Sequence, residues 1–244
     1  MKNSNITTHK SAYFFKRLKK FPIIVSFSDR EFDLGFKQGI KNRKKFLNNI
    51  GINHRDLVCL KQPHRSKVVG VTRSHRGKGA LSYRSAISGD GLVSNENRVP
   101  LAVFTADCLS IFLFCPKTKT IGLIHSGWRG TKANIAKKAI FIMEKKFNCR
   151  PKDIIVCFGP AIRQCCYEVG KDFKKNFKKG LIKRDGKFFL DLAKINKTQL
   201  ISSGVKKKNI IDSRICTSCE NKKFFSYRKE KNKTGRIMSV IMLK

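Results

Sequence analysis

Two apolar segments at the centre of the chain limit its fold most strongly. LAVFTADCLSIFLFCP (101–116) is apolar almost throughout, and TIGLIHS (120–126) follows after a short turn. Runs of this kind indicate neighbouring strands that are buried on both faces. The polar TADC sequence predicts a strand break, because Asp107 would be costly if it pointed unpaired into a core. The chain is therefore expected to bend toward a polar cavity at this point.

The flanking segments alternate between the patterns typical of strands and helices. Apolar spacing predicts helices over 37–52, 131–147 and 189–205, the last with Asp191 near its start. Short β-rich runs predict strands over 21–27, 57–64, 67–71 and 153–162, and a hairpin over 224–243. A Gly/Ser/Arg-rich loop is expected over 72–91. We predict one mixed α/β (α+β) domain over 21–244, preceded by a flexible basic segment over 1–20.

Composition narrows the class of protein. The formal net charge is +38, spread over both halves of the chain, and lysine-rich solvated surfaces explain it more simply than a dedicated nucleic-acid-binding face. Weak, salt-sensitive adhesion to nucleic acid is expected either way. No apolar run reaches about 18 residues, and charges interrupt every apolar stretch of the N-terminus. We therefore predict neither a membrane span nor a signal peptide, and a cytoplasmic location. The nine cysteines are an odd number without an export signal, which predicts reduced thiols.

Three residues stand out as candidates for chemistry. Of five histidines, His64 and His125 each come just after or at the end of a predicted strand, where loops carry function on a rigid frame. Cys108 lies at the predicted strand break. Two imidazoles and one thiolate would suit a catalytic zinc site with an open fourth position. The spacings of 44 and 17 residues are not those of a zinc finger, and Cys108 acting as a nucleophile with His125 as its base stays open.

Several long segments, in order, resemble one known family. They are TADCLSIFLFCP, IGLIHSGWRG, CFGPAIRQCCYEVG and FFSYRKEKNKTGRIMSVIML, together with KQPH and SGDGLVSN. The chain from about 21 to 243 is similar to the multicopper polyphenol oxidase (laccase) domain family, which includes zinc-dependent purine nucleoside phosphorylases, adenosine deaminases and peptidoglycan editing factors. It departs from that family at Pro63, at Arg65, in the short loop SDREFDLGF and at Arg163-Gln164, which affects loop geometry and substrate preference.

The resemblance implies α/β/β/α layers and a metal ion bound by His64, Cys108 and His125. It also implies phosphorolysis of adenosine, inosine, guanosine or S-methyl-5'-thioadenosine, with adenosine deamination alongside, so that a purine nucleoside and phosphate are the expected partners. Zinc is the expected metal and copper the alternative. A multicopper cluster would need roughly ten histidines in paired segments, and five scattered histidines do not provide them.

The remaining candidates would surround such a metal. Arg129 and Arg228 are candidate phosphate ligands because a guanidinium binds phosphate through paired hydrogen bonds. Asp90 and Asp107 are candidates for orienting ligands or for acid/base roles. Tyr227 and Phe225 offer rings for purine stacking.

Two alternative functions stay open, and one further cysteine motif is present. The chain could instead be a Cys108/His125 cysteine hydrolase or amidase that acts on cell-wall peptide intermediates, or a basic nucleic-acid-binding module. Cys216 and Cys219 have the CxxC spacing, but the sequence places no second pair at a suitable distance for a zinc ribbon. Those two cysteines, and the adjacent Cys165 and Cys166, are therefore predicted to be reduced thiols.

Overall fold

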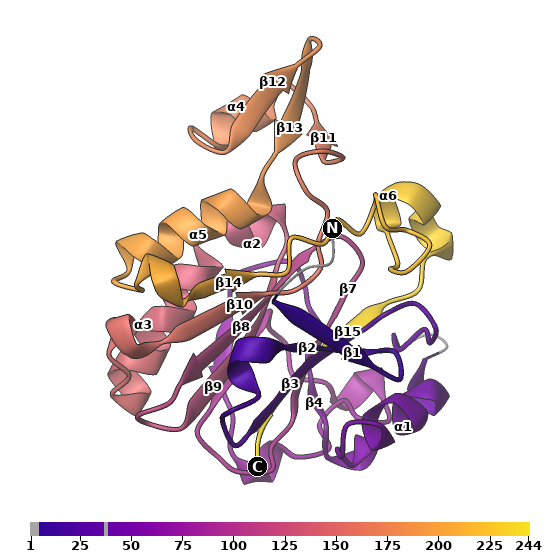
Figure 1. Ribbon diagram of the computed structural model, residues 1–244, viewed down its shortest axis with the longest axis vertical. Helices are drawn as coiled ribbons and strands as arrows, with labels where there is room; N and C mark the ends of the chain where they lie inside the picture. Colours follow the sequence, from indigo (N-terminus) through magenta and orange to yellow (C-terminus); the bar gives the residue numbers. More distant parts are fainter. Residues whose placement is uncertain (1–4, 37–38) are drawn as a thin grey trace.

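Two six-stranded β-sheets form the centre of the computed structural model, which describes residues 5–36 and 39–244 (Figure 1). The first sheet has the order β1 (Ile6–His9), β2 (Ala12–Phe15), β3 (Ile23–Ser28), β15 (Ile237–Leu243), β7 (Leu101–Thr105) and β4 (Val58–Cys59). The second has the order β14 (Ile210–Asp212), β10 (Ile155–Phe158), β8 (Leu109–Cys115), β9 (Thr120–Ser126), β6 (Gly91–Ser94) and β5 (Val68–Gly70). Both sheets mix parallel and antiparallel pairs.

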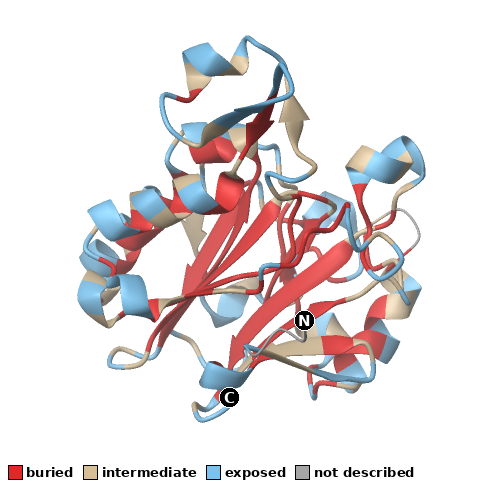
Figure 2. Cartoon of the chain, turned by 45° about the horizontal axis from the view of Figure 1, so that its top comes forward, coloured by how far each residue is buried: buried red, intermediate tan, exposed pale blue. Residues whose placement is uncertain are grey.

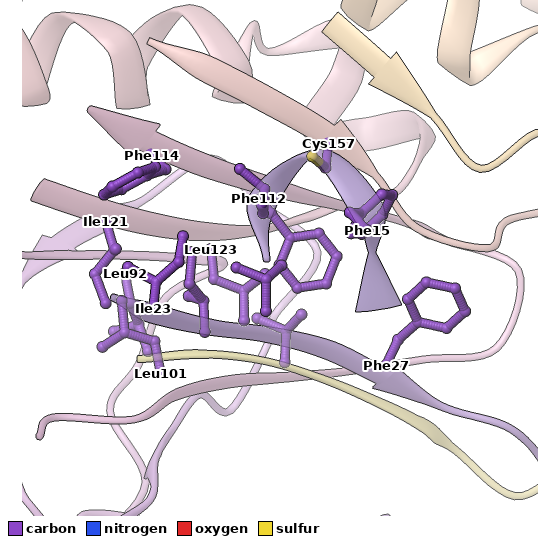
Figure 3. Close-up of a cluster of buried hydrophobic side chains, with 14 of the residues drawn as sticks. Phe15, Ile23, Phe27, Leu92, Leu101, Phe112, Phe114, Ile121, Leu123 and Cys157 are labelled. Carbon is purple, nitrogen blue, oxygen red and sulfur yellow. The ribbon is translucent and has the colours of Figure 1, made fainter. Parts of the chain in front are cut away.

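The apolar runs at the centre of the sequence are β7, β8 and β9. The strands β8 and β9 are neighbours, as predicted, and they pair antiparallel. Every residue of these three strands is buried. Their side chains alternate between two cores: Phe112 and Leu123 face the first sheet, whereas Ile111 and Ile124 face helices. Figure 3 shows the core between the sheets, where rings from both sheets meet. Strands covered on both faces need apolar residues at every position, which explains the unbroken runs.

Helices cover the outer faces of the two sheets. The helices α3 (Ile135–Phe147) and α5 (Leu192–Ser202) pack on the second sheet, and α1 (Ile40–Asn48) packs on the first. The predicted α/β/β/α layers are confirmed, with buried strands inside and exposed helix faces outside (Figure 2). Asp191, expected near the start of the last predicted helix, caps α5, because its side chain accepts from the Lys194 N–H at 2.8 Å. Residues 37 and 38 of the first predicted helix lie outside the described residues.

A smaller unit stands above the second sheet in Figure 1. It consists of a three-stranded sheet in the order β11 (Glu168–Val169), β13 (Lys187–Leu190) and β12 (Leu181–Arg184), with α4 (Phe173–Asn176) beside it. Its apolar side chains pack against Trp128 of α2 (Trp128–Lys132) and Leu192 of α5. Tyr167, just before β11, packs against the same cluster.

The flexible N-terminus predicted from sequence is wrong for residues 5–20. The strands β1 and β2 form a hairpin, and β2 pairs with β3, so the hairpin extends the first sheet. Phe15 is buried between Phe27 of the first sheet and Phe112 of the second. Burial of this ring explains why the segment is structured, although its neighbours in the sequence are mostly basic. Residues 1–4 lie outside the described residues.

The predicted C-terminal hairpin over 224–243 is also wrong. Only its second run is a strand, β15, which lies between β3 and β7. The first run turns into the short helix α6 (Tyr227–Glu230) and a 3-10 turn over Lys231–Lys233. Glu230 accepts from the Ser226 N–H and the Thr234 hydroxyl and pairs with Arg30 at 2.7 Å, which stabilises this compact fold of the loop.

No helix within residues 5–36 and 39–244 is both long enough and apolar enough to cross a lipid bilayer.

Arg43 on α1 is the largest fully buried side chain of the described residues. Its guanidinium donates to the carbonyls of Leu34, Gly79 and Ala80, and it lies over the rings of Phe36 and Phe104. We expect Arg43→Ala to lower the free energy of unfolding by about 3 kcal/mol, because it leaves buried carbonyls without donors. Urea unfolding of this variant, with the exposed Lys44→Ala on the same helix as control, measures the effect. A loss for Arg43→Ala no larger than that of the control would contradict this role.

Candidate metal centre

Three side chains from distant parts of the sequence meet at one end of the two sheets. One ligand atom each from His64, Cys108 and His125 lies within 4.8 Å of the other two. The two imidazole rings are perpendicular, with their centroids 4.7 Å apart. This is the trio singled out in the sequence, and its donor atoms converge on one point as metal ligands do.

The topology explains why these three residues converge. His64 lies on the crossover from β4 in the first sheet to β5 in the second, and Cys108 lies on the crossover from β7 to β8. His125 is the penultimate residue of β9, paired with Ser110 at the start of β8. The candidate centre therefore lies where the chain passes from one sheet to the other.

The carboxylate of Asp90 organises this end of the sheets. Asp90 is fully buried just before β6, and its Oδ1 accepts from His125 Nδ1 at 2.9 Å and from the His64 N–H at 3.0 Å. Its Oδ2 accepts from the Arg65 N–H at 2.8 Å. Burial raises the pKa of Asp90, but these hydrogen bonds outweigh it and hold the pKa below its ordinary value. Because Nδ1 of His125 faces Asp90, its Nε2 is left to face Cys108 and His64.

Cys108 and His125 stabilise each other's charged forms. Burial disfavours both charges, yet the neighbouring imidazoles lower the pKa of the Cys108 thiol to about 6. Burial likewise opposes protonation of His125, but the Cys108 thiolate and Asp90 raise its pKa to about 9. The thiolate, which is the form that binds metal or attacks an electrophile, is thus available at neutral pH. Gly127 leaves room for it, since a Cβ there would stand 3.0 Å from Cys108 Sγ.

Asp107 has a different position from Asp90. Its backbone has a positive φ of 85°, and its carboxylate accepts from the Thr217 hydroxyl and the Arg228 N–H, both at 2.6 Å. These contacts tie the crossover that carries Cys108 to two later loops. His64 also has a positive φ, 60°, so two residues of the site adopt a conformation that non-glycine residues rarely take.

The trio opens on a cavity of about 1180 Å³. The phosphate candidates Arg129 and Arg228 and the stacking candidate Tyr227 line it, and their binding roles stay predictions. Arg129 is exposed and stacks on Trp128, whereas Arg228 donates to the Glu168 carbonyl at 2.7 Å. The sequence did not indicate the remaining aromatic and charged side chains of the lining, which are Asp33, Phe36, Lys61, Tyr83, Phe104, Trp128, Tyr167, Lys231, Lys233 and Arg236. The lysine-rich and glycine-containing stretch after Tyr227 predicts a hairpin turn, whereas it forms a loop that lines the cavity.

Phe225 does not have the position expected of a stacking residue. It is buried in the core between the sheets and is not among the residues that line the cavity. The guanidinium of Arg30 lies 5.1 Å from its ring centroid, and a Cβ at Gly235 would stand 2.6 Å from its ring. The reason is the turn at Ser226, which sends Tyr227 outward and keeps Phe225 inside.

Comparison with known proteins places the chain in a family. The sequence model described as "Multi-copper polyphenol oxidoreductase laccase" matches residues 36–244. The chain belongs to this family. It is 35% identical over 212 residues to purine nucleoside phosphorylase YlmD of Geobacillus stearothermophilus, covering 83% of this chain and 77% of the relative. It is 32% identical over 205 residues to adenosine deaminase RL5 from an unknown prokaryotic organism, covering 80% and 78%.

Solved structures show the same fold. The crystal structure of the hypothetical protein YfiH of Bacillus licheniformis superposes with a TM-score of 0.93 at 28% identity, covering 99% of this chain and 100% of that chain. The name of the laccase family suggests several copper ions, but the donors found here are two histidines and one cysteine at a single point. The other three histidines, His9, His54 and His75, are not part of this cluster. The site therefore has the donors for one metal ion and lacks those of a multicopper cluster.

We expect Asp90→Asn to lower the affinity of this site for Zn²⁺ about 10–100-fold, since the carboxylate that orients His125 and His64 becomes a neutral amide. Competition with a chromogenic chelator measures the affinity. Asp185→Asn in an exposed turn is the matched control. Equal affinities in the two variants would show that Asp90 does not orient the ligands.

In metal-free protein, Cys108 should react with iodoacetamide with a midpoint near pH 6, because its lowered pKa makes the thiolate the main form above that pH. Cys59, whose pKa burial raises to about 12, should stay unreactive over the same range. Site-resolved mass spectrometry of the alkylated peptides reports both residues. A Cys108 midpoint at or above pH 8 would contradict the charge stabilisation described above.

Proposed function

We propose that this protein is a zinc-dependent purine nucleoside phosphorylase of the laccase family, with adenosine deaminase activity, that acts in the cytoplasm. The observation that carries the proposal is the convergence of His64, Cys108 and His125 on a cavity lined by aromatic rings and cations. The relatives named purine nucleoside phosphorylase and adenosine deaminase support the substrate class. The nine cysteines, all free in the structure, are consistent with a reducing compartment.

The donor set fits zinc better than the copper of the family name. Catalytic zinc sites have three protein ligands of the imidazole, carboxylate or thiolate type and one open position. His64, Cys108 and His125 are the ligands in this proposal, and copper is the alternative metal. When bound, zinc supplies Lewis acidity toward an oxygen or nitrogen of the substrate. Asp90 holds His125 in the tautomer that such a metal requires.

Cations at the cavity would bind phosphate. Phosphorolysis brings a phosphate dianion to C1' of the nucleoside, so positive charge is needed beside that carbon. Arg129 is exposed at the cavity and can present its guanidinium edge while its face stays on Trp128. Arg228 is positioned by its contacts with Asp107 and Glu168, and Lys231 and Lys233 add charge nearby.

Aromatic residues would bind the purine. Tyr227 is exposed at the cavity, and Tyr167 lines it from the segment before β11. Burial raises the pKa of Tyr167, which keeps its hydroxyl protonated at neutral pH. A protonated hydroxyl can donate a hydrogen bond to the departing base, on which negative charge develops. We assign Tyr167 that role and Tyr227 the stacking role.

One observation favours a second function, hydrolysis by Cys108. The lowered pKa of Cys108 and the raised pKa of His125 describe a thiolate and imidazolium pair, as in cysteine hydrolases and amidases. A substrate of that kind would be a cell-wall peptide intermediate. Metal content separates the two functions, because bound zinc occupies the thiolate that the hydrolase needs.

The test is product analysis with zinc-loaded protein and each of adenosine, inosine, guanosine and S-methyl-5'-thioadenosine. We expect free base and sugar 1-phosphate only when phosphate is present, and inosine from adenosine without it. Arg129→Ala should raise the KM for phosphate about 10-fold or more, because a charged hydrogen bond contributes about 1.5–3 kcal/mol. His64→Ala and Cys108→Ala should abolish both activities.

Lys137→Ala, on the exposed face of α3, is the matched control and should behave as the unchanged protein. The proposal fails if no nucleoside yields free base or inosine. It also fails if His64→Ala keeps full activity. Peptide cleavage by metal-free protein that is lost in Cys108→Ala would support the hydrolase instead.

A further inference from the structure

A second cluster of metal-binding side chains lies apart from the candidate metal centre. One sulfur each from Cys165, Cys166, Cys216 and Cys219 lies within 4.8 Å of the other three. The Sγ atoms of Cys166 and Cys219 are 3.3 Å apart, and those of Cys165 and Cys219 are 3.5 Å apart. We name these four residues the thiol cluster. Its members range from buried Cys216 to exposed Cys165 and Cys219.

Backbone pairing brings the two halves of the thiol cluster together. Ala161 and Cys216 form a parallel bridge, and the Thr217 N–H donates to the Ala161 carbonyl at 3.1 Å. Cys165 and Cys166 lie in the turn that follows this bridge. On the other side, the Glu220 N–H donates to the Cys216 carbonyl at 2.9 Å and closes the turn that holds Cys216 and Cys219. The sequence prediction that CxxC here has no second pair is corrected, because the pair lies about fifty residues earlier and is adjacent rather than spaced.

The distances fit a metal with four thiolate ligands. Zinc–sulfur bonds of about 2.3 Å in a tetrahedron place the sulfurs about 3.8 Å apart. A disulfide would need about 2.05 Å, and none of the nine cysteines, all within the described residues, forms one. Backbone hydrogen bonds from Cys219 and Arg163 reach the Cys216 sulfur, and such bonds favour the thiolate that binds metal.

We propose that the thiol cluster binds a second zinc ion. Four protein ligands leave no open position, so this ion is structural and does not take part in the reaction. The proposal does not depend on the function proposed above, because it concerns different ligands and a different role.

The thiol cluster stands behind one wall of the cavity. Tyr167, which lines the cavity, directly follows Cys166. Thr217, which lies between Cys216 and Cys219, donates its hydroxyl to Asp107, the neighbour of Cys108. The Glu168 carbonyl, two residues after Cys166, accepts from Arg228. Zinc at the thiol cluster would therefore hold together the two loops that position the cavity wall.

Zinc analysis of the full chain, purified with reductant and zinc, tests the proposal. We expect about two zinc ions per chain. The double variant His64→Ala/Cys108→Ala removes the candidate metal centre and leaves the thiol cluster intact, so it should keep about one zinc ion. Cobalt added to this double variant in place of zinc should give the intense charge-transfer absorption of tetrahedral cobalt thiolate.

Substitution within the thiol cluster should remove the zinc ion of that cluster and leave the candidate metal centre occupied. Cys219→Ser, at an exposed position, should lose one zinc ion and keep the ion at His64, Cys108 and His125. Cys149→Ser is the matched control, because its sulfur already contacts the Thr118 hydroxyl and a serine there keeps a partner. This control should keep both ions.

Two outcomes would overturn the proposal. The first is a double variant His64→Ala/Cys108→Ala that folds, by circular dichroism, yet binds neither zinc nor cobalt. The second is an intact mass, measured without reductant on freshly purified protein, that is lower by the hydrogens lost in disulfides and returns on reduction. Failure of the nucleoside assay would leave both measurements unaffected, so the two proposals fail separately.

Discussion

The buried carboxylate of Asp90 is the interaction on which the candidate metal centre depends. A carboxylate without partners would be expensive to bury, and here three N–H donors offset that cost. Two of them are backbone groups of the crossover that carries His64, and the third is the ring of His125. The Asp90 side chain thus holds the crossover between β4 and β5 in a fixed position relative to β9 of the second sheet. The proposed roles of the cations and rings that line the cavity depend on that arrangement.

The layered fold follows from patterns that are visible in the sequence. The strands β8 and β9 have unbroken apolar residues because both of their faces are covered, and α3 has the apolar stripe of a helix packed on one side. His64, Cys108 and His125 were also recognisable, since each lies just after or at the end of an apolar run. Only the family resemblance implies that they bind a metal, because spacings of 44 and 17 residues do not determine a geometry.

The parts that sequence did not predict depend on contacts between distant segments. Phe15 packs against the rings of Phe27 and Phe112, which are distant in the sequence. The local pattern of the basic N-terminus therefore does not predict that this segment is structured. The loop after Ser226 is held by Glu230 and Arg30, which are 200 residues apart, and not by cross-strand pairs. The thiol cluster joins an adjacent pair of cysteines to a CxxC pair through one bridge at Ala161. In each of these three regions, the local sequence pattern can be interpreted only once the contacts between distant segments are known.

The two crossovers also couple the candidate metal ligands to the distance between the two sheets. His64 and Cys108 lie where the chain leaves the first sheet for the second, whereas His125 belongs to the second sheet alone. The ring of Phe15 separates Phe27 in one sheet from Phe112 in the other, so such rings set the distance between the sheets. Because interiors are close-packed and transmit strain, a larger or smaller core side chain would change the separation of the ligands without touching them. The volume of the core and the geometry of the candidate metal centre therefore cannot change independently in this fold.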